Sequence, residues 1–349
     1  MTRVVPADDE GIAAAAAALR AGRLVAFPTE TVYGLGARAR DPGAVAAVFR
    51  AKGRPADHPL IVHVASPGEL DAWVDPVPEA ALRLARRYWP GPLTLVLRRA
   101  PGVPDAVTGG QPTVAVRAPA HPVAHALLRT LGEGVAAPSA NRFGRISPTT
   151  AGHVAAEFPE LELTILDGGP CDVGLESTIL DLSGVRPRLL RPGAISAADL
   201  EATLERPVAL AANRPGPDDV PRVPGRLASH YAPTAPLRLA DEDDLEAAVA
   251  ATPGAALLLR RAPRPAGHRG PSRRLPDDPA GYGRGLYAAL RALDAEGPPG
   301  LVVERPPGTA PWSAVRDRLA RAAGPREDVP AAEPRGTGAP SAPSEEEER

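Results

Sequence analysis

The sequence predicts an α/β protein built on a mixed β-sheet, followed by a smaller α/β unit. Short apolar runs typical of strands alternate with helical segments over roughly the first two hundred residues. Connections as short as residues 109–112 join consecutive strands, which favours a mixed sheet over a wholly parallel one. The alternation stops in a proline-rich stretch and then resumes, which indicates a second unit.

The elements of the first unit follow from helix and strand signals along the chain. Asp41-Pro42 combines a helix N-cap with a first-turn proline, so a helix is expected from there to Lys52. Further helices are expected over the alanine run 13–18, from Ser66-Pro67 onward and over 121–131. Strands are expected at 24–27, 60–64, 93–97, 113–116, 134–137, 164–166, 178–182 and 189–190.

Four segments are predicted from composition. Residues 1–205 form the first domain, and the proline-rich residues 206–235 form a linker or lid. Residues 236–324 form a small α/β domain. The tail 325–349 contains mostly Pro, Gly, Ala and charged residues and is expected to be disordered. Within the small domain we expect a helix from Asp241 to Val249, strands at 255–259 and 301–303, and helices at 281–295 and 313–323.

Charge and cysteine content limit the possible classes of protein. A net charge of −2 argues against general affinity for nucleic acid. Cys171 is the only cysteine, so an oxidising compartment gains no support. The N-terminal residues are acidic where a signal peptide would be basic, and the alanine run is too short to cross a membrane. A soluble cytoplasmic protein without a membrane partner is expected.

Two rare residue types point to one polar site. Lys52 is the only lysine among 40 basic residues and lies in KGRP at 52–55. A lysine ammonium is a compact point charge that suits phosphate, and Arg54 can point into the same cleft; a solvated helix end is the alternative. Asn141, one of two asparagines, ends the polar triplet SAN at 139–141.

Polar groups also follow or interrupt predicted strands. PTETVYGLG at 28–36 brings hydroxyls and a carboxylate to a strand end, where ligands bind in α/β sheets; a tight turn with capping hydroxyls is the alternative. His63 interrupts an apolar strand, as a hydrogen-bonded core histidine also would. Arg117 follows a strand and can pair with a small carboxylate or form a surface ion pair.

Nothing in the sequence favours covalent or metal-based catalysis by the protein itself. His121 and His125 have helical metal spacing, but the glutamate of a zinc-protease motif is missing. No serine triad motif is found, and Cys171 has no helper nearby in sequence. We therefore expect neither a covalent nucleophile nor protein metal ligands.

Together these strings resemble the L-threonylcarbamoyladenylate synthases of the YrdC type, in their longer two-domain form. The resemblance covers the first domain nearly end to end and the linker, whereas the C-terminal unit matches in position and size only. It implies a YrdC-like domain with a twisted mixed sheet and a large concave cleft, plus a Rossmann-like C-terminal domain. The matching segments are PTETVYGLG at 28–36, KGRP and HPLIVHV within 52–64, TVAVRAP at 113–119, PSAN at 138–141, ESTI at 176–179, RPGAI at 191–195, and PG with HYAP within 224–233.

Such enzymes are nucleotidyltransferases that make threonylcarbamoyl-AMP from L-threonine, bicarbonate and ATP and release pyrophosphate. A separate transferase complex then modifies the adenosine beside the anticodon, so tRNA is only an indirect partner. Mg²⁺ would arrive with ATP and not on dedicated protein ligands. The residues implied for ATP are Lys52, Arg54, His58, Thr113, Ser139, Asn141, Ser147, Arg191 and Tyr231, with His58 standing where many relatives carry asparagine. Those implied for threonine are Thr31, His63, Arg117 and Ser177, with Thr29 an alternative to Thr31.

Two other classes share the predicted fold. An RNA-binding module is disfavoured by the near-neutral charge and the 3% aromatic content. A carbamoyl transferase or maturation factor would carry an acylphosphatase module or zinc-finger cysteines, and a single cysteine excludes the zinc fingers.

Replacing the only lysine by arginine tests whether it grips phosphate. We expect Lys52→Arg to lower ATP turnover by at least about tenfold, or about 1.4 kcal/mol of transition-state stabilisation, because a planar guanidinium cannot replace a point charge. Steady-state turnover of the purified variant measures this. Unchanged turnover would mean that Lys52 does not grip phosphate.

Overall fold

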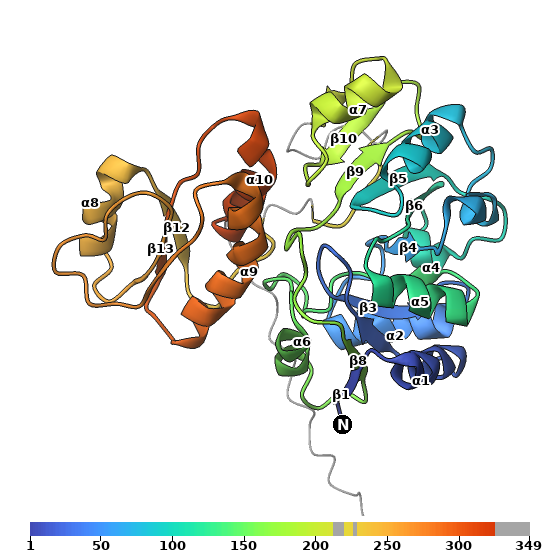
Figure 1. The fold of residues 1–349 in the computed structure, drawn as a ribbon, viewed down its shortest axis with the longest axis horizontal. Coiled ribbons are helices and arrows are strands. Elements are labelled where there is room, and N and C mark those ends of the chain that lie inside the picture. The colour runs from blue at the N-terminus through green and yellow to red at the C-terminus, as the bar shows by residue number, and fades with distance from the viewer. Residues whose placement is uncertain (212–219, 226–228, 325–349) are drawn as a thin grey trace, which may run out of the picture.

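The computed structural model describes residues 1–211, 220–225 and 229–324, and Figure 1 shows a larger N-terminal and a smaller C-terminal unit. The predicted disordered tail lies outside the described residues, as do parts of the predicted linker.

The larger unit is organised around one mixed sheet. Within the described residues this sheet has 11 strands in the order β1-β8-β2-β3-β7-β4-β6-β5-β9-β10-β11. Parallel pairs such as β4 with β6 alternate with antiparallel pairs such as β5 with β6, which confirms the predicted mixed sheet. The strands are β1 (Arg3–Pro6), β2 (Val25–Phe27), β3 (Gly34–Arg38), β4 (Ile61–His63), β5 (Leu93–Arg98), β6 (Thr113–Arg117), β7 (Val135–Ala136), β8 (Thr164–Asp167), β9 (Thr178–Asp181), β10 (Arg188–Arg191) and β11 (Ala209–Leu210).

The helices of this unit begin and end where the local sequence provides caps. The Asp41 side chain accepts hydrogen bonds from the Gly43 and Ala44 amides, and Gly53 ends the same helix in the left-handed conformation. The helix expected after Ser66 is the short 3₁₀ segment η1 (Pro67–Ala72). The α-helices are α1 (Asp9–Arg20), α2 (Pro42–Lys52), α3 (Glu79–Tyr88), α4 (Asp105–Thr108), α5 (Pro122–Leu131), α6 (Ala151–Glu157) and α7 (Ala197–Leu204).

The sequence prediction missed β3, because its two glycines are typical of a loop. Strand β3 pairs with β2 and β7, and their side chains crowd Gly36. A Cβ on Gly36 would lie 2.8 Å from both the Phe27 ring and a Val135 methyl, closer than side chains pack. Glycine therefore lets the neighbouring strands fill this space.

The two faces of the large sheet are covered differently. Helices α2, α3 and α7 pack on one face, over residues such as Ala26, Leu95 and Val116. On the opposite face α1 and α5 cover only the half around Val25 and Phe27. The other half of that face carries a small apolar cluster, which includes Ile61, Val96, Ala115, Ile179 and Leu190 and is covered by Val223 of the linker. The concave part of the molecule therefore lies over strands β4, β6, β5, β9 and β10.

The C-terminal unit is a four-stranded parallel sheet in the order β12-β15-β13-β14. Its α9 and α10 lie on the side that faces the larger unit, and α8 lies on the far side (Figure 1). The helix expected from Asp241 is split into a 3₁₀ turn and α8, because Asp241 pairs with Arg305 at 2.8 Å instead of capping. The elements are β12 (Leu237–Ala240), η2 (Glu242–Asp244), α8 (Leu245–Ala250), β13 (Ala256–Leu259), β14 (Ser272–Arg274), α9 (Pro279–Ala295), β15 (Leu301–Glu304), η3 (Ala310–Trp312) and α10 (Ser313–Ala322).

One apolar cluster crosses the boundary between the units. It joins Leu258, Leu290 and other core residues of the second unit to Val32, Ile146 and Leu175 of the first. The interface is thus a buried core and not a loose contact. In the described parts of the chain, every helix falls short of the length and apolar character needed to span a lipid bilayer.

Candidate functional site

A pocket lies on the half of the sheet face that no helix covers. Its free volume is about 40 Å³, well below the roughly 300–1,000 Å³ of typical ligand sites. The lining residues come from the ends of β3, β4, β6, β9 and β10, from the loops after β2, α2 and β7, and from the linker. They are Thr29, Thr31, Val32, Gly34, Arg54, Ile61, His63, Arg117, Ala137, Pro138, Ser139, Glu176, Ser177, Arg191, Pro224, Gly225, His230 and Tyr231.

Two predicted residues meet through strand register. His63 on β4 pairs directly with Arg117 on β6, so both side chains leave the sheet on the same face. The Arg117 guanidinium is buried, donates to Gly91 O at 3.1 Å and to Thr31 Oγ1 at 2.8 Å, and forms an ion pair with Glu30 at 2.6 Å. The surface ion pair considered from the sequence is therefore a buried one.

His63 is an uncharged polar group at the base of this pocket. Burial, and next the nearby Arg117 charge, lower the pKa of His63 to about 3. Its ring meets Phe27 edge-on with centroids 6.0 Å apart, and its Nδ1 is buried without a hydrogen-bond partner among the described residues. At neutral pH the imidazole can therefore take part in hydrogen bonds but carries no charge.

Hydroxyl groups line the same end of the pocket. The Thr29 and Thr31 hydroxyls lie 2.7 Å apart, and Thr29 also donates to Val32 O at 2.7 Å. Ser177 Oγ lies 2.7 Å from Thr94 Oγ1 and accepts from Arg191 at 3.1 Å. Both threonines remain candidates, with Thr31 the one that Arg117 contacts directly.

Two further cations, Arg54 and Arg191, line the pocket. Arg54 donates to Pro59 O at 3.0 Å, and its guanidinium lies 5.8 Å from the centre of the Phe143 ring. Burial lowers the pKa of Arg54 to about 10. Arg191 donates to Ser177 O at 3.0 Å and to Pro224 O at 3.1 Å, and burial lowers its pKa as well.

Lys52 lies behind this wall and does not line the pocket. Its ammonium donates to Ser139 O at 2.6 Å and to Asn141 O, so it binds the backbone of the SAN triplet on the side away from the pocket. Burial, followed by the Arg54 charge, lowers the pKa of Lys52 well below its usual value. An anion in the pocket would offset the repulsion between these cations.

The linker closes the pocket from above. Tyr231 is 1% exposed, adopts a left-handed φ of 61° and stacks on Tyr287 of α9 with ring centroids 5.8 Å apart. Gly225 is required opposite it, because a Cβ there would lie 2.1 Å from the tyrosine hydroxyl oxygen and φ is +82°. Burial, then the charges of Arg54, Lys52 and Arg191, lower the pKa of the neighbouring His230 well below its usual value.

The structure brings most of the predicted site residues together. Eight line the pocket, namely Thr31, Arg54, His63, Arg117, Ser139, Ser177, Arg191 and Tyr231. Five others do not line it. Lys52 and Asn141 lie next to Ser139, and Ser147 donates to Glu176 at 2.6 Å. His58 contacts Phe143 edge-on, with ring centroids 5.5 Å apart, and Thr113 begins β6, at the opposite end from Arg117.

Sequence reasoning missed the partners of two carboxylates. Glu176 lies in the ESTI motif, but its partners Tyr287 and Arg318 belong to amphipathic helices that carry no motif. Glu30 lies in the PTETVYGLG motif, but its ion pair with Arg117 depends on the sheet register. In the described part of the chain no three His, Cys, Asp or Glu side chains form a group that could hold a metal ion.

Fold and pocket define the class: a YrdC-type mixed-sheet domain joined to a second α/β domain. A family model described as "Telomere recombination", built on Sua5, YciO and YrdC proteins, matches residues 17–193. A second model, described as the C-terminal domain of threonylcarbamoyl-AMP synthase, matches residues 195–324. A Bacillus subtilis protein named threonylcarbamoyl-AMP synthase is 40% identical over 93% of this chain and 96% of its own length. The chain belongs to the threonylcarbamoyl-AMP synthase family, in its two-domain form.

Solved structures agree over the whole described architecture. P. abyssi Sua5 in complex with L-threonine has a TM-score of 0.84 and 38% identity, over 93% of this chain and 97% of the other. A variant of the same protein, with a histidine and the adjacent tyrosine both replaced by alanine, has a TM-score of 0.86 and 37% identity over 93% and 96%.

The low pKa of His63 predicts how stability depends on pH. The unfolded histidine binds a proton below about pH 6.5, whereas the folded one stays neutral down to about 3, so stability falls as the pH falls through this window. Between pH 6.5 and 4.5 this residue should remove roughly 2–3 kcal/mol from the free energy of unfolding. His63→Gln should lose this component, as denaturant melts at both pH values would show. An unchanged difference between the two pH values would mean that His63 is not held neutral.

Proposed function

We propose that this protein synthesises L-threonylcarbamoyl-AMP from L-threonine, bicarbonate and ATP and releases pyrophosphate, the first step of tRNA threonylcarbamoyladenosine modification. Family membership over the whole described chain supports this function, as does the threonine complex of the P. abyssi relative. The observation that carries it is one pocket lined both by hydroxyls with Arg117 and by the further cations Arg54 and Arg191, with Lys52 just behind its wall. An amino acid and a polyphosphate are the ligands that such a pocket suits.

The threonine end is suited to a small zwitterion. A guanidinium has five N–H donors, and the contacts of Arg117 leave donors for a substrate carboxylate. Thr31 and Ser177 offer hydroxyls to the amine and the β-hydroxyl, and neutral His63 adds a group that does not repel the amine. In this role the four residues act together by positioning the substrate.

The reaction then needs orientation and charge neutralisation more than covalent help. The neutral amine of threonine attacks the carbon of bicarbonate, and the bicarbonate hydroxyl leaves as water with one proton from the nitrogen, which gives a carbamate. A carbamate oxygen attacks the α-phosphorus of ATP, and the bond to the bridging oxygen breaks to release pyrophosphate. Cations held at fixed positions stabilise the charge that develops on the phosphates.

Residues assigned to ATP have graded roles in this proposal. Arg54, Ser139 and Arg191 contact it directly from the pocket wall, and Tyr231 covers it. Lys52, Asn141 and Ser147 shape the adjoining loop and reach the phosphates when the pocket opens, while His58 and Thr113 are secondary contacts. Mg²⁺ enters with ATP, which supplies its phosphate oxygens. The product passes to a separate transferase complex, so tRNA is met only indirectly.

The linker is proposed to act as a lid. The free volume of about 40 Å³ is too small for ATP while Tyr231, Pro224 and Gly225 fill the mouth of the pocket. The linker must therefore move to admit ATP, and its return would exclude water from the labile mixed anhydride.

Pyrophosphate release is the direct test of this function. ATP should yield pyrophosphate only when L-threonine and bicarbonate are both present, and omission of either one should abolish the release. Pyrophosphate release from ATP alone, or with an amino acid but without bicarbonate, would reject the proposed reaction.

Amino-acid choice tests the hydroxyl-lined end of the pocket. If Thr31 or Ser177 binds the β-hydroxyl, valine should lose roughly 10⁴-fold in kcat/KM, because its methyl leaves buried polar groups unpaired. Serine lacks only a methyl group and should lose roughly 10–200-fold. Competition assays with both amino acids measure this order. Equal use of valine and serine would show that the pocket does not recognise the hydroxyl.

A further inference from the structure

One face of helix α9 contacts three segments that build the nucleotide end of the site. Tyr287, Arg291 and Asp294 follow each other at helical spacings of four and three residues, so they share a face. Tyr287 donates to Glu176 at 2.9 Å, and Asp294 accepts from the Thr234 and Ala235 amides at 2.8 and 2.9 Å. Arg291 lies between them and faces the loop of residues 141–147, which we call the nucleotide loop.

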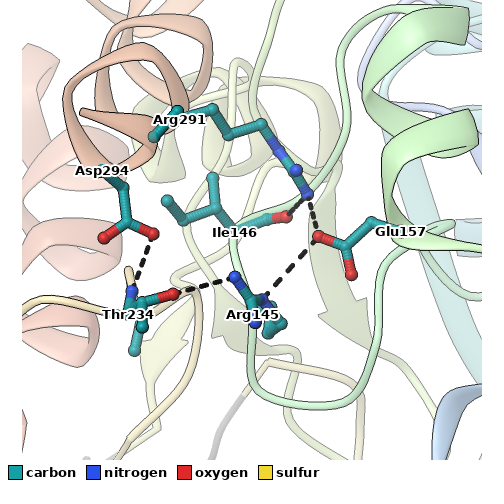
Figure 2. A pocket seen from close by; sticks show the side chains of 8 residues that line it. Arg145, Ile146, Glu157, Thr234, Arg291 and Asp294 are labelled. Atoms are coloured by element: carbon teal, nitrogen blue, oxygen red, sulfur yellow. Dashed lines mark hydrogen bonds and ion pairs between the residues drawn. The ribbon is translucent and has the colours of Figure 1, made fainter. Parts of the chain in front are cut away.

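The side chain of Arg291 binds backbone carbonyls of the nucleotide loop. Figure 2 shows its guanidinium directed at Ile146 O and at the Glu157 carboxylate, on the wall of a pocket of about 200 Å³. It donates to Glu157 Oε1 at 2.8 Å, to Ile146 O, and to Ser147 O at 3.4 Å. The side chain of Arg291 is 15% exposed and that of Glu157 only 6%, so the pair is partly shielded from water.

The groups that Arg291 holds continue directly into the nucleotide site. Glu157 also accepts from the Arg142 amide at 2.9 Å, which fixes the start of the nucleotide loop. The Asn141 side chain donates to Arg142 O at 2.7 Å and to Arg145 O at 2.9 Å, and its Oδ1 is buried without a partner among the described residues. At the end of the loop, Ser147 donates to Glu176. Both ends of the loop thus depend on contacts that Arg291 makes or shares.

The second unit contributes to the site through this interface. The place where its own sheet would bind a ligand is filled by a side chain. Ligands of parallel α/β sheets bind at the carboxyl ends of the strands. There Glu304 ends β15, and its carboxylate accepts from the Arg260, Arg261 and Ala262 amides at 2.6, 2.9 and 3.1 Å. The chain's own carboxylate occupies the place where an anionic ligand would bind.

We propose that Arg291 is a positioning residue for ATP, through which the C-terminal unit fixes the nucleotide loop and with it Asn141 and Ser147. This inference rests on the proposed function for the identity of the nucleotide. It gives the second unit a defined role, because without Arg291 the loop loses the bonds to Ile146 O and Ser147 O at its end, and the Glu157 carboxylate at its start loses a cation. The contacts that Lys52 and Glu176 make with the loop would remain.

The test compares Arg291→Ala with Arg284→Ala. Arg284 lies on the same helix and donates across the same boundary, to Asp172 O at 2.7 Å, but it does not contact the nucleotide loop. Arg291→Ala should weaken ATP binding, measured by calorimetry without threonine, by about tenfold, and raise KM for ATP by a similar factor. KM for threonine should change less than about twofold, and Arg284→Ala should match the unmodified protein in all three.

Chemical rescue separates positioning from a general loss of structure. Because the pocket beside Arg291 is open, guanidinium ions at concentrations that do not denature the protein should restore ATP affinity to Arg291→Ala, and an equal concentration of sodium chloride should not. Arg291→Lys keeps the charge and should lose less affinity than the alanine variant. If Arg291→Ala does not fold, the ATP affinity of Arg291→Lys is measured instead.

Four results would overturn the inference: unchanged ATP affinity in a folded Arg291→Ala, equal losses for ATP and threonine, equal effects of Arg284→Ala, or no rescue of a folded Arg291→Ala by guanidinium. If Arg291→Ala does not fold, unchanged ATP affinity in Arg291→Lys would overturn it. Failure of the proposed function looks different. The unmodified protein would then bind ATP but not make threonylcarbamoyl-AMP, and the calorimetric comparison would still decide the role of Arg291.

Discussion

The carboxylate of Glu176 is the group on which the arrangement of both units depends. It accepts from Ser147 at 2.6 Å, from Tyr287 at 2.9 Å and from Arg318 at 2.6 Å, and thereby joins the nucleotide loop, α9 and α10 at the wall of the pocket. Burial by itself would raise the pKa of Glu176, but Arg318 and Arg191 hold it below the usual value, so the group is ionised. Removing one partner of a buried ion pair costs roughly 3–5 kcal/mol of stability. Because Glu176 belongs to the pocket and Arg318 to the second unit, the pocket wall is stable only when the interface is formed.

This coupling also involves a side chain of the second unit that packs behind the lining of the pocket, against Glu176 and Tyr231. Arg318 is completely buried, donates to Pro192 O at 3.0 Å and lies 5.4 Å from the centre of the Tyr231 ring. The linker tyrosine is therefore packed between two residues of the C-terminal unit, Arg318 and Tyr287. The packing of Tyr231 over the pocket and the docking of the second unit therefore share contacts.

The electrostatics of the pocket favour an anionic ligand for a related reason. Lys52, Arg54 and Arg191 are buried near each other, and burial lowers the pKa of each. His230, which faces the same cations, is held neutral by burial and by their charge. Folding thus brings positive charges together at a cost that an anion in the pocket would offset.

The sequence determined the mixed α/β fold, the two units and most of the pocket, because local patterns encode them. Strand and helix periodicity predicted many of the elements, and the rare residues Lys52 and Asn141 pointed to one polar site. The shared face of His63 and Arg117, by contrast, depends on the strand register and was not predicted from the sequence. The roles of the thirteen predicted residues toward ATP and threonine remain predictions.

Only the tertiary structure decided which groups pair across the chain. Glu176 and Arg318 are 142 residues apart in sequence, and Arg291 and Ile146 are 145 residues apart, with both arginines in helices that carry no motif. Whether Lys52 lines the pocket or supports its wall was likewise open, because it depends on where the SAN carbonyls lie. The physical reason is that periodicity and caps act over a few residues, whereas a buried charge is satisfied by whatever partner the fold brings within about 3 Å of it.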